Sequence, residues 1–231
     1  MRPRESDAAA TRAGGTTRVL LVDDHTLFRQ GMAAIINEEP LVVCGEADSV
    51  RTAIAAAAET TPDLALVDLS IKHGDGLELL RDLRNPLPEV RTLVLSMYDE
   101  TVYAERALRA GAKAYIMKAE AAKTVITAIR QVLQGETYLS PRMATLLAER
   151  ATGENGGGDA AKRTGADRPS GRELQVLRCV GRGLSTREIA EELFDSIRTV
   201  EAHREHIKQK LGLVSSGELL RYTIEYKRVE R

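Results

Sequence analysis

Carboxylates, a hydroxyl and an ammonium follow short apolar segments in the first half of this 231-residue sequence. Asp23 and Asp24 come directly after one such segment and Asp68 after another, while Ser96 and Lys118 follow two more. Grouped carboxylates repel one another unless a cation binds their oxygens, and Mg²⁺ is held in proteins by carboxylates together with water. A lysine and a hydroxyl beside such an ion can bind phosphoryl oxygens, and an aspartate can accept the phosphoryl group. These residue types therefore predict phosphoryl transfer if the fold brings them together.

The apolar segments are short, nearly continuous and rich in leucine and β-branched residues, which is typical of strands buried on both faces of a parallel sheet. They are residues 19–22, 41–44, 64–67, 92–95 and 114–117. Helical patterns alternate with them at about 26–37, 49–59, 75–84, 100–110 and 121–134. This alternation predicts a doubly wound α/β domain with a five-stranded parallel sheet of the flavodoxin-like kind. Ligands of such sheets bind at the carboxyl ends of the strands, which is where the candidate residues lie.

Composition divides the chain into two predicted domains, 18–135 and 168–231. The polar segment 1–17 lacks an apolar core and is expected to be a disordered tail, not a secretory signal. Residues 153–167 contain three consecutive glycines and predict flexibility in a linker over 136–167. No apolar stretch approaches the ~18 residues of a membrane-spanning helix, so no membrane partner is expected.

Charge is distributed unevenly between the two parts of the chain. Residues 162–231 contain 15 basic and 11 acidic residues, whereas the remainder contains 18 basic and 23 acidic residues. An acidic first part and a basic second part favour cation chemistry in the first and nucleic-acid binding in the second. Cys44 and Cys179 are far apart in the sequence and form neither a disulfide framework nor a zinc motif. We therefore expect a reducing compartment, the cytoplasm.

The segments VLLVDDH, LALVDLS, LVLS and AYIMK occur in an order and spacing that resemble the receiver domain of bacterial response regulators. The resemblance implies that Asp68 accepts a phosphoryl group from a phosphohistidine on a sensor histidine kinase. It also implies that Asp23 and Asp24 hold Mg²⁺, with Asp68 and the backbone carbonyl of Ser70 as the remaining protein ligands.

The same resemblance assigns roles to the residues around the acceptor. Lys118 would pair with a phosphoryl oxygen, Ser96 would move to hydrogen-bond the phosphoryl group, and Tyr115 would turn inward behind Ser96. Many receivers carry Met-Pro shortly after the acceptor, whereas residues 70–74 here read Ser-Ile-Lys-His-Gly. This departure affects the expected conformation of the loop and the expected lifetime of the phosphoryl group. Ser70 and Tyr98 are expected to flank the path of the attacking water and so to tune that lifetime.

The second part of the chain predicts a small all-α domain of four helices. Serine caps are expected to begin the first three: Ser170 and Ser185, each in a capping box, and Ser196. The third helix is predicted over 196–211 and the last over about 216–228. A short helix, a tight turn and a longer helix are the helix-turn-helix arrangement.

The segments RELQVL, GLSTREIAEELF and TVEAHREHIKQKLG resemble the LuxR-type helix-turn-helix. A receiver followed by this domain resembles the NarL/FixJ group of transcription regulators, which implies a phosphorylation-dependent DNA-binding regulator of a two-component system and no enzyme. The implied partners are a sensor kinase, double-stranded DNA, RNA polymerase and, when phosphorylated, a second copy of the chain. The implied DNA-binding residues are Arg198, Thr199, Glu201, Ala202, Arg204, Glu205, Lys208 and Lys210. We also expect this helix to be occluded in the unphosphorylated form.

Two other functions compete with this hypothesis. Aspartyl-phosphate phosphatases share a nucleophilic aspartate and Mg²⁺, but they typically carry a second aspartate two residues later, where this chain has Ser70. Alternatively, the second domain docks protein without selective DNA binding, since Glu201 and Glu205 stand where better-known members often carry lysine and would repel phosphate. Selective retention of DNA would distinguish this last reading from the regulator.

Overall fold

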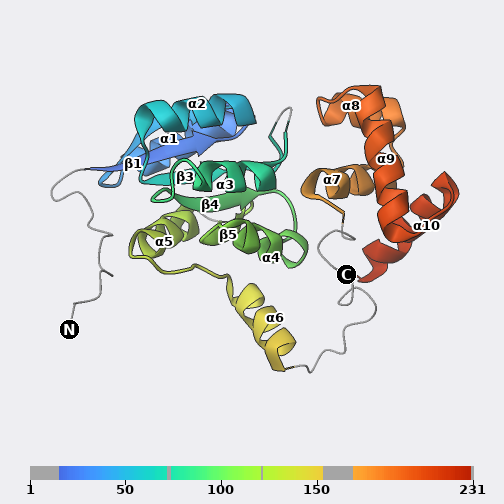
Figure 1. Ribbon diagram of the computed structural model, residues 1–231. Helices are drawn as coiled ribbons and strands as arrows, with labels where there is room; N and C mark the ends of the chain where they lie inside the picture. The colour runs from blue at the N-terminus through green and yellow to red at the C-terminus, as the bar shows by residue number, and fades with distance from the viewer. Residues whose placement is uncertain (1–15, 72–73, 121, 153–168, 230–231) are drawn as a thin grey trace, which may run out of the picture.

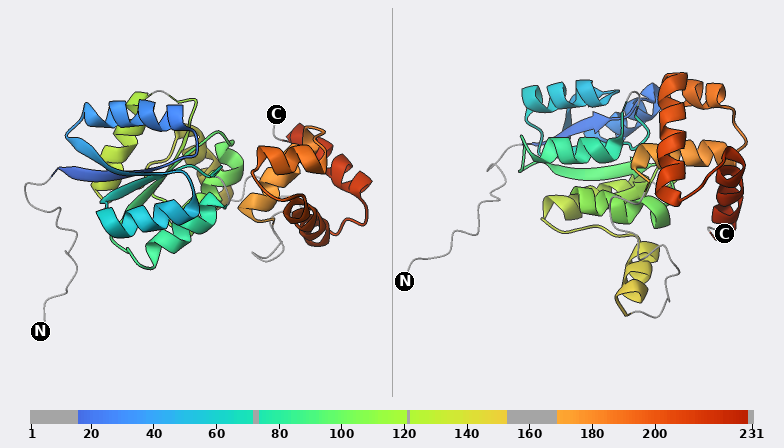
Figure 2. Two further views of the ribbon diagram at one scale, coloured as in Figure 1. Left: turned by 90° about the horizontal axis from the view of Figure 1, so that it is seen from above. Right: turned by 45° about the vertical axis from the view of Figure 1, so that its right-hand side comes forward.

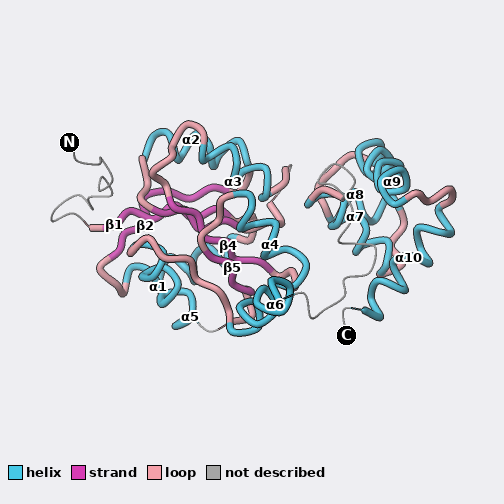
Figure 3. The backbone as a smooth tube through the Cα atoms, turned by 60° about the horizontal axis from the view of Figure 1, so that its bottom comes forward, coloured by secondary structure: helices cyan, strands magenta, loops and turns pink. Residues whose placement is uncertain are grey.

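The computed structural model describes residues 16–71, 74–120, 122–152 and 169–229 (Figure 1). The predicted tail, except Thr16 and Thr17, and the glycine-rich segment 153–167 lie outside these residues. Within the residues that the structure describes, all the strands belong to the first part of the chain, and the regular elements after β5 are helices (Figure 3). Among the helices that the structure describes, none combines the length and the apolar composition that a membrane span requires.

The first part forms one five-stranded parallel sheet, as the sequence predicts. Its strands are β1 (Thr17–Val22), β2 (Leu41–Ala47), β3 (Leu64–Val67), β4 (Arg91–Ser96) and β5 (Ala114–Met117). Their order across the sheet is β2-β1-β3-β4-β5, with every pair parallel. This is the flavodoxin-like doubly wound order, in which the ligand crevice opens between β1 and β3.

Two layers of helices cover the sheet (Figure 2). The helices of this part are α1 (Thr26–Asn37), α2 (Val50–Thr60), α3 (Gly76–Arg84), α4 (Glu100–Ala110) and α5 (Ala122–Leu133). Alternate strand residues divide between the two layers, because successive side chains point to opposite faces. Val19 and Leu21 pack with α1 and α5, whereas Leu20 and Val22 pack with α2, α3 and α4. Both faces are therefore apolar, and polar side chains gather at the strand ends.

Strand β2 is longer than the sequence predicts. Its pairing with β1 shifts by one residue, so that Val19 pairs with Val43 and Leu20 with Gly45. A Cβ at position 45 would lie 3.1 Å from Leu20 Cδ1, which suits glycine at this close approach. The apolar pattern stops at this glycine although the strand continues, and the predicted end at residue 44 is therefore too early.

The remaining regular elements of the described chain are helices. They are α6 (Pro141–Thr152), α7 (Gly171–Gly181), α8 (Thr186–Glu192), α9 (Ile197–Leu211) and α10 (Ser216–Val229). The expected caps are present: the hydroxyls of Ser170, Ser185 and Ser196 accept hydrogen bonds from the first turns of α7, α8 and α9. The last four helices pack around one apolar core, as expected of a helix-turn-helix domain. They contribute, in chain order, Val176, Ile189, Val200 and Leu219.

Candidate phosphoryl-transfer site and DNA interface

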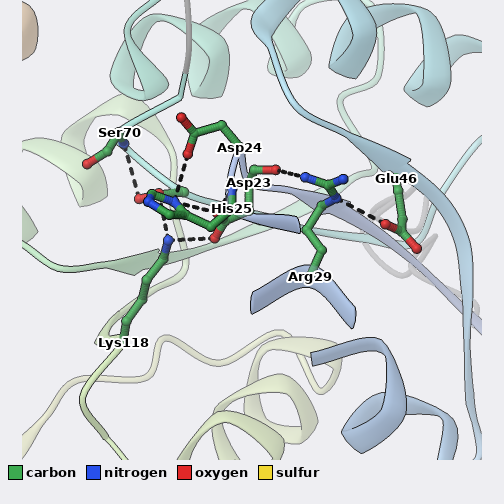
Figure 4. A network of polar contacts seen from close by, with 8 residues as sticks. Asp23, Asp24, His25, Arg29, Glu46, Ser70 and Lys118 are labelled. Carbon is green, nitrogen blue, oxygen red and sulfur yellow. Dashed lines mark hydrogen bonds and ion pairs between the residues drawn. The ribbon is translucent and has the colours of Figure 1, made fainter. Parts of the chain in front are cut away.

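The predicted constellation forms at the carboxyl edge of the sheet (Figure 4). Asp23 and Asp68 follow the neighbouring strands β1 and β3, and each is at most 4% exposed. Lys118 follows β5 and extends back across the edge. Its Nζ lies 2.6 Å from Asp23 Oδ2 and 2.7 Å from Asp68 Oδ2. Topology thus brings together three groups that are 45 or more residues apart in sequence.

Burial controls the charges in this site. Burial raises the pKa of the Asp68 carboxyl, Lys118 opposes the rise, and the negative charge of Asp23 adds to it. Burial alone would lower the pKa of Lys118, but Asp68 and Asp23 outweigh that effect and raise it. The raised pKa keeps Lys118 protonated between the two buried carboxyl groups.

The remaining carboxylate provides a test of whether the site suits a metal ion. Ligand atoms of Asp23, Asp24, His25 and Asp68 lie within 4.8 Å of one another. Asp24 Oδ1 is buried and accepts no hydrogen bond from the described residues. His25 Nδ1 lies 2.8 Å from it and is a charge partner only when that ring is protonated. A buried carboxylate oxygen whose close nitrogen belongs to an exposed histidine, beside two further carboxylates, fits a hard divalent cation such as Mg²⁺.

Arg29 binds the backbone of Asp23, a contact that the sequence did not reveal. Its guanidinium donates to the backbone carbonyl of Asp23 and, through Nε, to Glu46 Oε2 at 3.0 Å (Figure 4). A basic residue one turn into the helix after the acidic pair is the only signal in the sequence. The Phe28 ring lies 4.5 Å from Lys118 Nζ, where its face attracts the ammonium.

Ser96 and Tyr115 are connected through the loop between β4 and α4. Ser96 is fully buried, and its Oγ accepts a hydrogen bond from the Tyr98 amide at 3.1 Å. The Tyr115 hydroxyl donates to the Tyr98 carbonyl at 2.8 Å. Tyr115 is 2% exposed, so its ring already lies inward in this structure. Ser96 and Tyr115 therefore hydrogen-bond the backbone of the same residue, Tyr98.

Ser70 and Tyr98 lie together beside the acceptor, as the sequence suggests. The Ser70 amide donates to Asp68 Oδ1 at 3.1 Å. Burial raises the pKa of Tyr98 to about 12, while a hydrogen bond between its hydroxyl and Ser70 opposes the rise. Tyr98 also stacks on Tyr103, with 4.8 Å between the ring centroids. The phenol of Tyr98 is therefore neutral and held close to the Ser70 side of the acceptor.

The candidate DNA-binding residues all belong to α9, but they differ in exposure. Arg198, Glu201, Ala202 and Glu205 are exposed, and the others are half-buried. Each of the four half-buried residues has a polar partner: Thr199 contacts the Ser196 hydroxyl, Arg204 the Thr186 hydroxyl, Lys208 the Glu205 carboxylate and Lys210 the Glu173 carboxylate. Lys210 thus points toward α7 of its own domain, and the charge of Lys208 is compensated by the carboxylate of Glu205.

Family models match both parts of the chain. The response regulator receiver domain matches residues 19–130, and the bacterial regulatory proteins of the luxR family match residues 170–223. The oxygen regulatory protein NreC of Staphylococcus carnosus (strain TM300) is 38% identical over 214 residues, 91% of this chain and 98% of that protein. NreC of Staphylococcus aureus (strain JH9) is 38% identical over 217 residues, 92% of this chain and 99% of that protein.

Solved structures agree with this arrangement. A LuxR-family two-component response regulator from Aurantimonas sp. SI85-9A1 is 32% identical and covers 60% of this chain and 99% of its own, with a TM-score of 0.56. RcsB from Salmonella enterica serovar Typhimurium, bound to promoter P1flhDC in the presence of the phosphomimetic BeF₃⁻, is 24% identical. It covers 91% of this chain and 100% of its own with a TM-score of 0.59, which supports the fold. The chain therefore belongs to the two-component response regulators of the NarL/FixJ group, transcription regulators that join a receiver domain to a LuxR-type DNA-binding domain.

Proposed function

We propose that Asp68 is the phosphoacceptor of this regulator and that its phosphorylation changes DNA binding by α9. The observation that carries the proposal is the contact of Lys118 with both Asp68 and Asp23 in a buried site. Lys118 orients Asp68 now and is placed to contact a phosphoryl oxygen added to it. Ser96 and Tyr115, connected through Tyr98, are the proposed switch residues.

Phosphoryl transfer to Asp68 is a substitution at phosphorus. A carboxylate oxygen of Asp68 forms a P–O bond with the phosphoryl group of a phosphohistidine on the sensor kinase while the N–P bond breaks. The imidazole leaves with the electron pair of that bond and takes up a proton. The products are an aspartyl phosphate and a neutral histidine. Lys118 compensates negative charge on the phosphoryl oxygens without donating its proton, because its raised pKa keeps it protonated.

Asp23, Asp24 and Asp68, with the backbone carbonyl of Ser70, are the residues that would hold Mg²⁺. The ion would supply positive charge to the phosphoryl oxygens during transfer. The buried Asp24 Oδ1, which accepts no hydrogen bond with good geometry from the described residues, supports this assignment. Arg29 would keep Asp23 in place through its backbone carbonyl.

The proposed organisation is a receiver domain over 18–135, a linker over 136–167 and a DNA-binding domain over 168–231. A sensor histidine kinase and double-stranded DNA are the partners that the two family models imply. Contact with RNA polymerase, dimerisation on phosphorylation and a cytoplasmic location are further parts of the proposal. Two half-sites read by a symmetric dimer are the usual arrangement for helix-turn-helix regulators.

Labelling by a small phosphodonor tests the phosphoacceptor directly. Full-length protein is incubated with Mg²⁺ and phosphoramidate, and the phosphorylated residue is identified by mass spectrometry. We expect one phosphoryl group on Asp68 and none in Asp68→Asn. Asp82→Asn, an exposed aspartate on α3, is the matched control and should label like the wild type. Phosphorylation that persists in Asp68→Asn would overturn the assignment.

A further inference from the structure

One face of α9 is open to solvent. Arg198, Glu201, Ala202 and Glu205 are exposed, so the expectation that the receiver occludes this helix is wrong for this structure. The reason is that the helical domain faces the receiver through α7, which lies between the receiver and α9 (Figures 1 and 2). The exposed face of α9 is therefore available to a ligand.

The contact between the two domains is made at the start of α7. The Arg172 amide donates to Asp75 Oδ2 at 3.1 Å, while Asp75 Oδ1 accepts from the Leu77 amide at 2.8 Å. Asp75 is the N-cap of α3, so one carboxylate accepts from the first turns of two helices. A Cβ at Gly171 would lie 2.6 Å from Asp75 Oδ1, so this approach is as close as glycine allows. The domains thus meet through α7 and leave the acidic residues of α9 uncovered.

The two acidic residues on the open face differ in their partners. Glu205 Oε1 lies 2.7 Å from Lys208 Nζ, so the charge of Glu205 is compensated within the helix. The Glu201 side chain makes no ion pair or hydrogen bond with the residues that the structure describes. Arg204, one turn further along, contacts the Thr186 hydroxyl of α8 instead. Glu201 therefore presents an uncompensated carboxylate to a ligand of this face.

Glu201 also lies where a recognition helix meets base edges. It belongs to the first half of α9, and the early residues of such a helix contact bases in the major groove. Its surface neighbours are Ile197, one turn earlier and 49% exposed, and Ala202, whose short side chain permits a close approach. Neither apolar side chain supplies a hydrogen-bond donor, so a donor for Glu201 has to come from the DNA.

A carboxylate suits few of the groups that the major groove presents. It accepts hydrogen bonds and donates none, and the phosphates repel it. The donors at base edges are the amino groups of cytosine and adenine. Adenine places its N7 acceptor beside the amino group, and this acceptor repels the second carboxylate oxygen. Cytosine has no acceptor of its own at this edge and is therefore the base that glutamate favours.

We propose that Glu201 is a specificity-determining residue, which accepts a hydrogen bond from the amino group of a cytosine in the DNA site. The proposal rests on the function proposed above and specifies the DNA sequences that this function requires. Arg198, exposed in the first turn of α9, supplies attraction to phosphate, which positions the helix without reading sequence. Glu201 contributes selection between bases rather than affinity for DNA in general.

Selection from a library of randomised duplexes tests the proposal. Full-length protein is incubated with Mg²⁺ and phosphoramidate, and the bound sequences give the preference at each base pair. Wild type should enrich cytosine at one position, and Glu201→Gln should lose that preference and enrich adenine there, because an amide pairs with adenine N6 and N7. The affinities for the two single-base variants of the selected duplex should differ by about five-fold or more, in opposite senses for the two proteins.

Glu205→Gln is the matched control, since it removes the same charge from the same face one turn later. It should bind DNA more tightly and keep the cytosine preference of the wild type. Retention of that preference in Glu201→Gln would overturn the proposal, as would its loss in Glu205→Gln, which would make the effect one of charge alone. Failure of the wild type to enrich any sequence would instead contradict the proposed DNA-binding function.

Discussion

The ammonium of Lys118 contacts the carboxylate of Asp68 at 2.7 Å, although the two residues lie on different strand ends and 50 positions apart. Their side chains are 4% and 1% exposed, so solvent screens the pair little. Asp23 shares the same ammonium at 2.6 Å. The receiver can bury two carboxylates because Lys118 lies between them, and this arrangement governs both the stability and the chemistry of the site.

Removing Lys118 should destabilise the receiver. Lys118→Met leaves Asp23 and Asp68 buried without their cation, and breaking a buried ion pair in this way costs about 3–5 kcal/mol. Urea unfolding in the presence of EDTA measures the loss. Lys113→Met, an exposed lysine in the preceding turn, should unfold like wild type. Equal midpoints for Lys118→Met and wild type would show that the pair carries no stability.

Magnesium should stabilise the protein through Asp24. A ligand that binds only the folded state adds about 2.7 kcal/mol at a hundred-fold excess over its Kd, so the melting temperature should rise with Mg²⁺ concentration. Asp24→Ala removes one of the carboxylates that would bind the ion and should abolish this rise. The melting temperature of the control Asp82→Asn should rise with Mg²⁺ as that of the wild type does. A rise of equal size in Asp24→Ala would place the ion elsewhere.

The acceptor site could be predicted from the sequence because parallel strands end at one edge. Asp23, Asp68 and Lys118 each follow an apolar run, and the doubly wound order then forces them together. Strand ends and helix caps are local signals, which is why the caps of α7, α8 and α9 were also predictable. The end of β2 could not be predicted from the sequence, because Gly45 interrupts the apolar pattern inside the strand.

The interdomain contact could not be predicted in the same way. Asp75 and Arg172 are 97 positions apart and meet through a backbone amide, which any residue type supplies. Asp75 alone reads as an ordinary helix cap, and Gly171 as a helix start. Only the geometry shows that one carboxylate serves two helices. The partners of Lys208 and Lys210 were hidden for a similar reason, since an exposed lysine and a paired lysine look alike in a sequence.

Mild acid should destabilise the DNA-binding domain through His203. Burial lowers the pKa of His203 below its ordinary value of 6.5. The charges of Arg172 and His206 also lower this pKa, whereas those of Asp195 and Glu173 oppose the shift. The unfolded chain therefore takes up the proton first, and stability present above pH 6.5 is lost as the pH falls through and below that value. Melting of wild type and His203→Gln at pH 7.5 and 5.5 measures this loss, which should be smaller in the variant. An equal loss in both would exclude His203 as the cause.

Neutralising Glu205 should strengthen electrostatic binding to DNA. Its carboxylate pairs with Lys208 at 2.7 Å, so Glu205→Gln frees one ammonium for phosphate and removes one repelling charge. Affinity should rise, and the slope of log K against log salt should steepen by about 0.9 for the added phosphate contact. Glu105→Gln, which faces Arg109 on α4 of the receiver, is the control and should leave the slope unchanged. An unchanged slope for Glu205→Gln would show that Lys208 does not reach the backbone.

The central claim is that phosphorylation of Asp68 changes DNA binding, and retention of genomic fragments across a salt series tests it most directly. Wild type and Asp68→Asn are compared with and without Mg²⁺ and phosphoramidate. The account predicts that the phosphodonor changes selective retention by wild type and leaves Asp68→Asn unaltered. Identical retention with and without donor would contradict the switch. Loss of all selective retention in both proteins would contradict the regulator and favour a second domain that docks protein through the acidic face of α9.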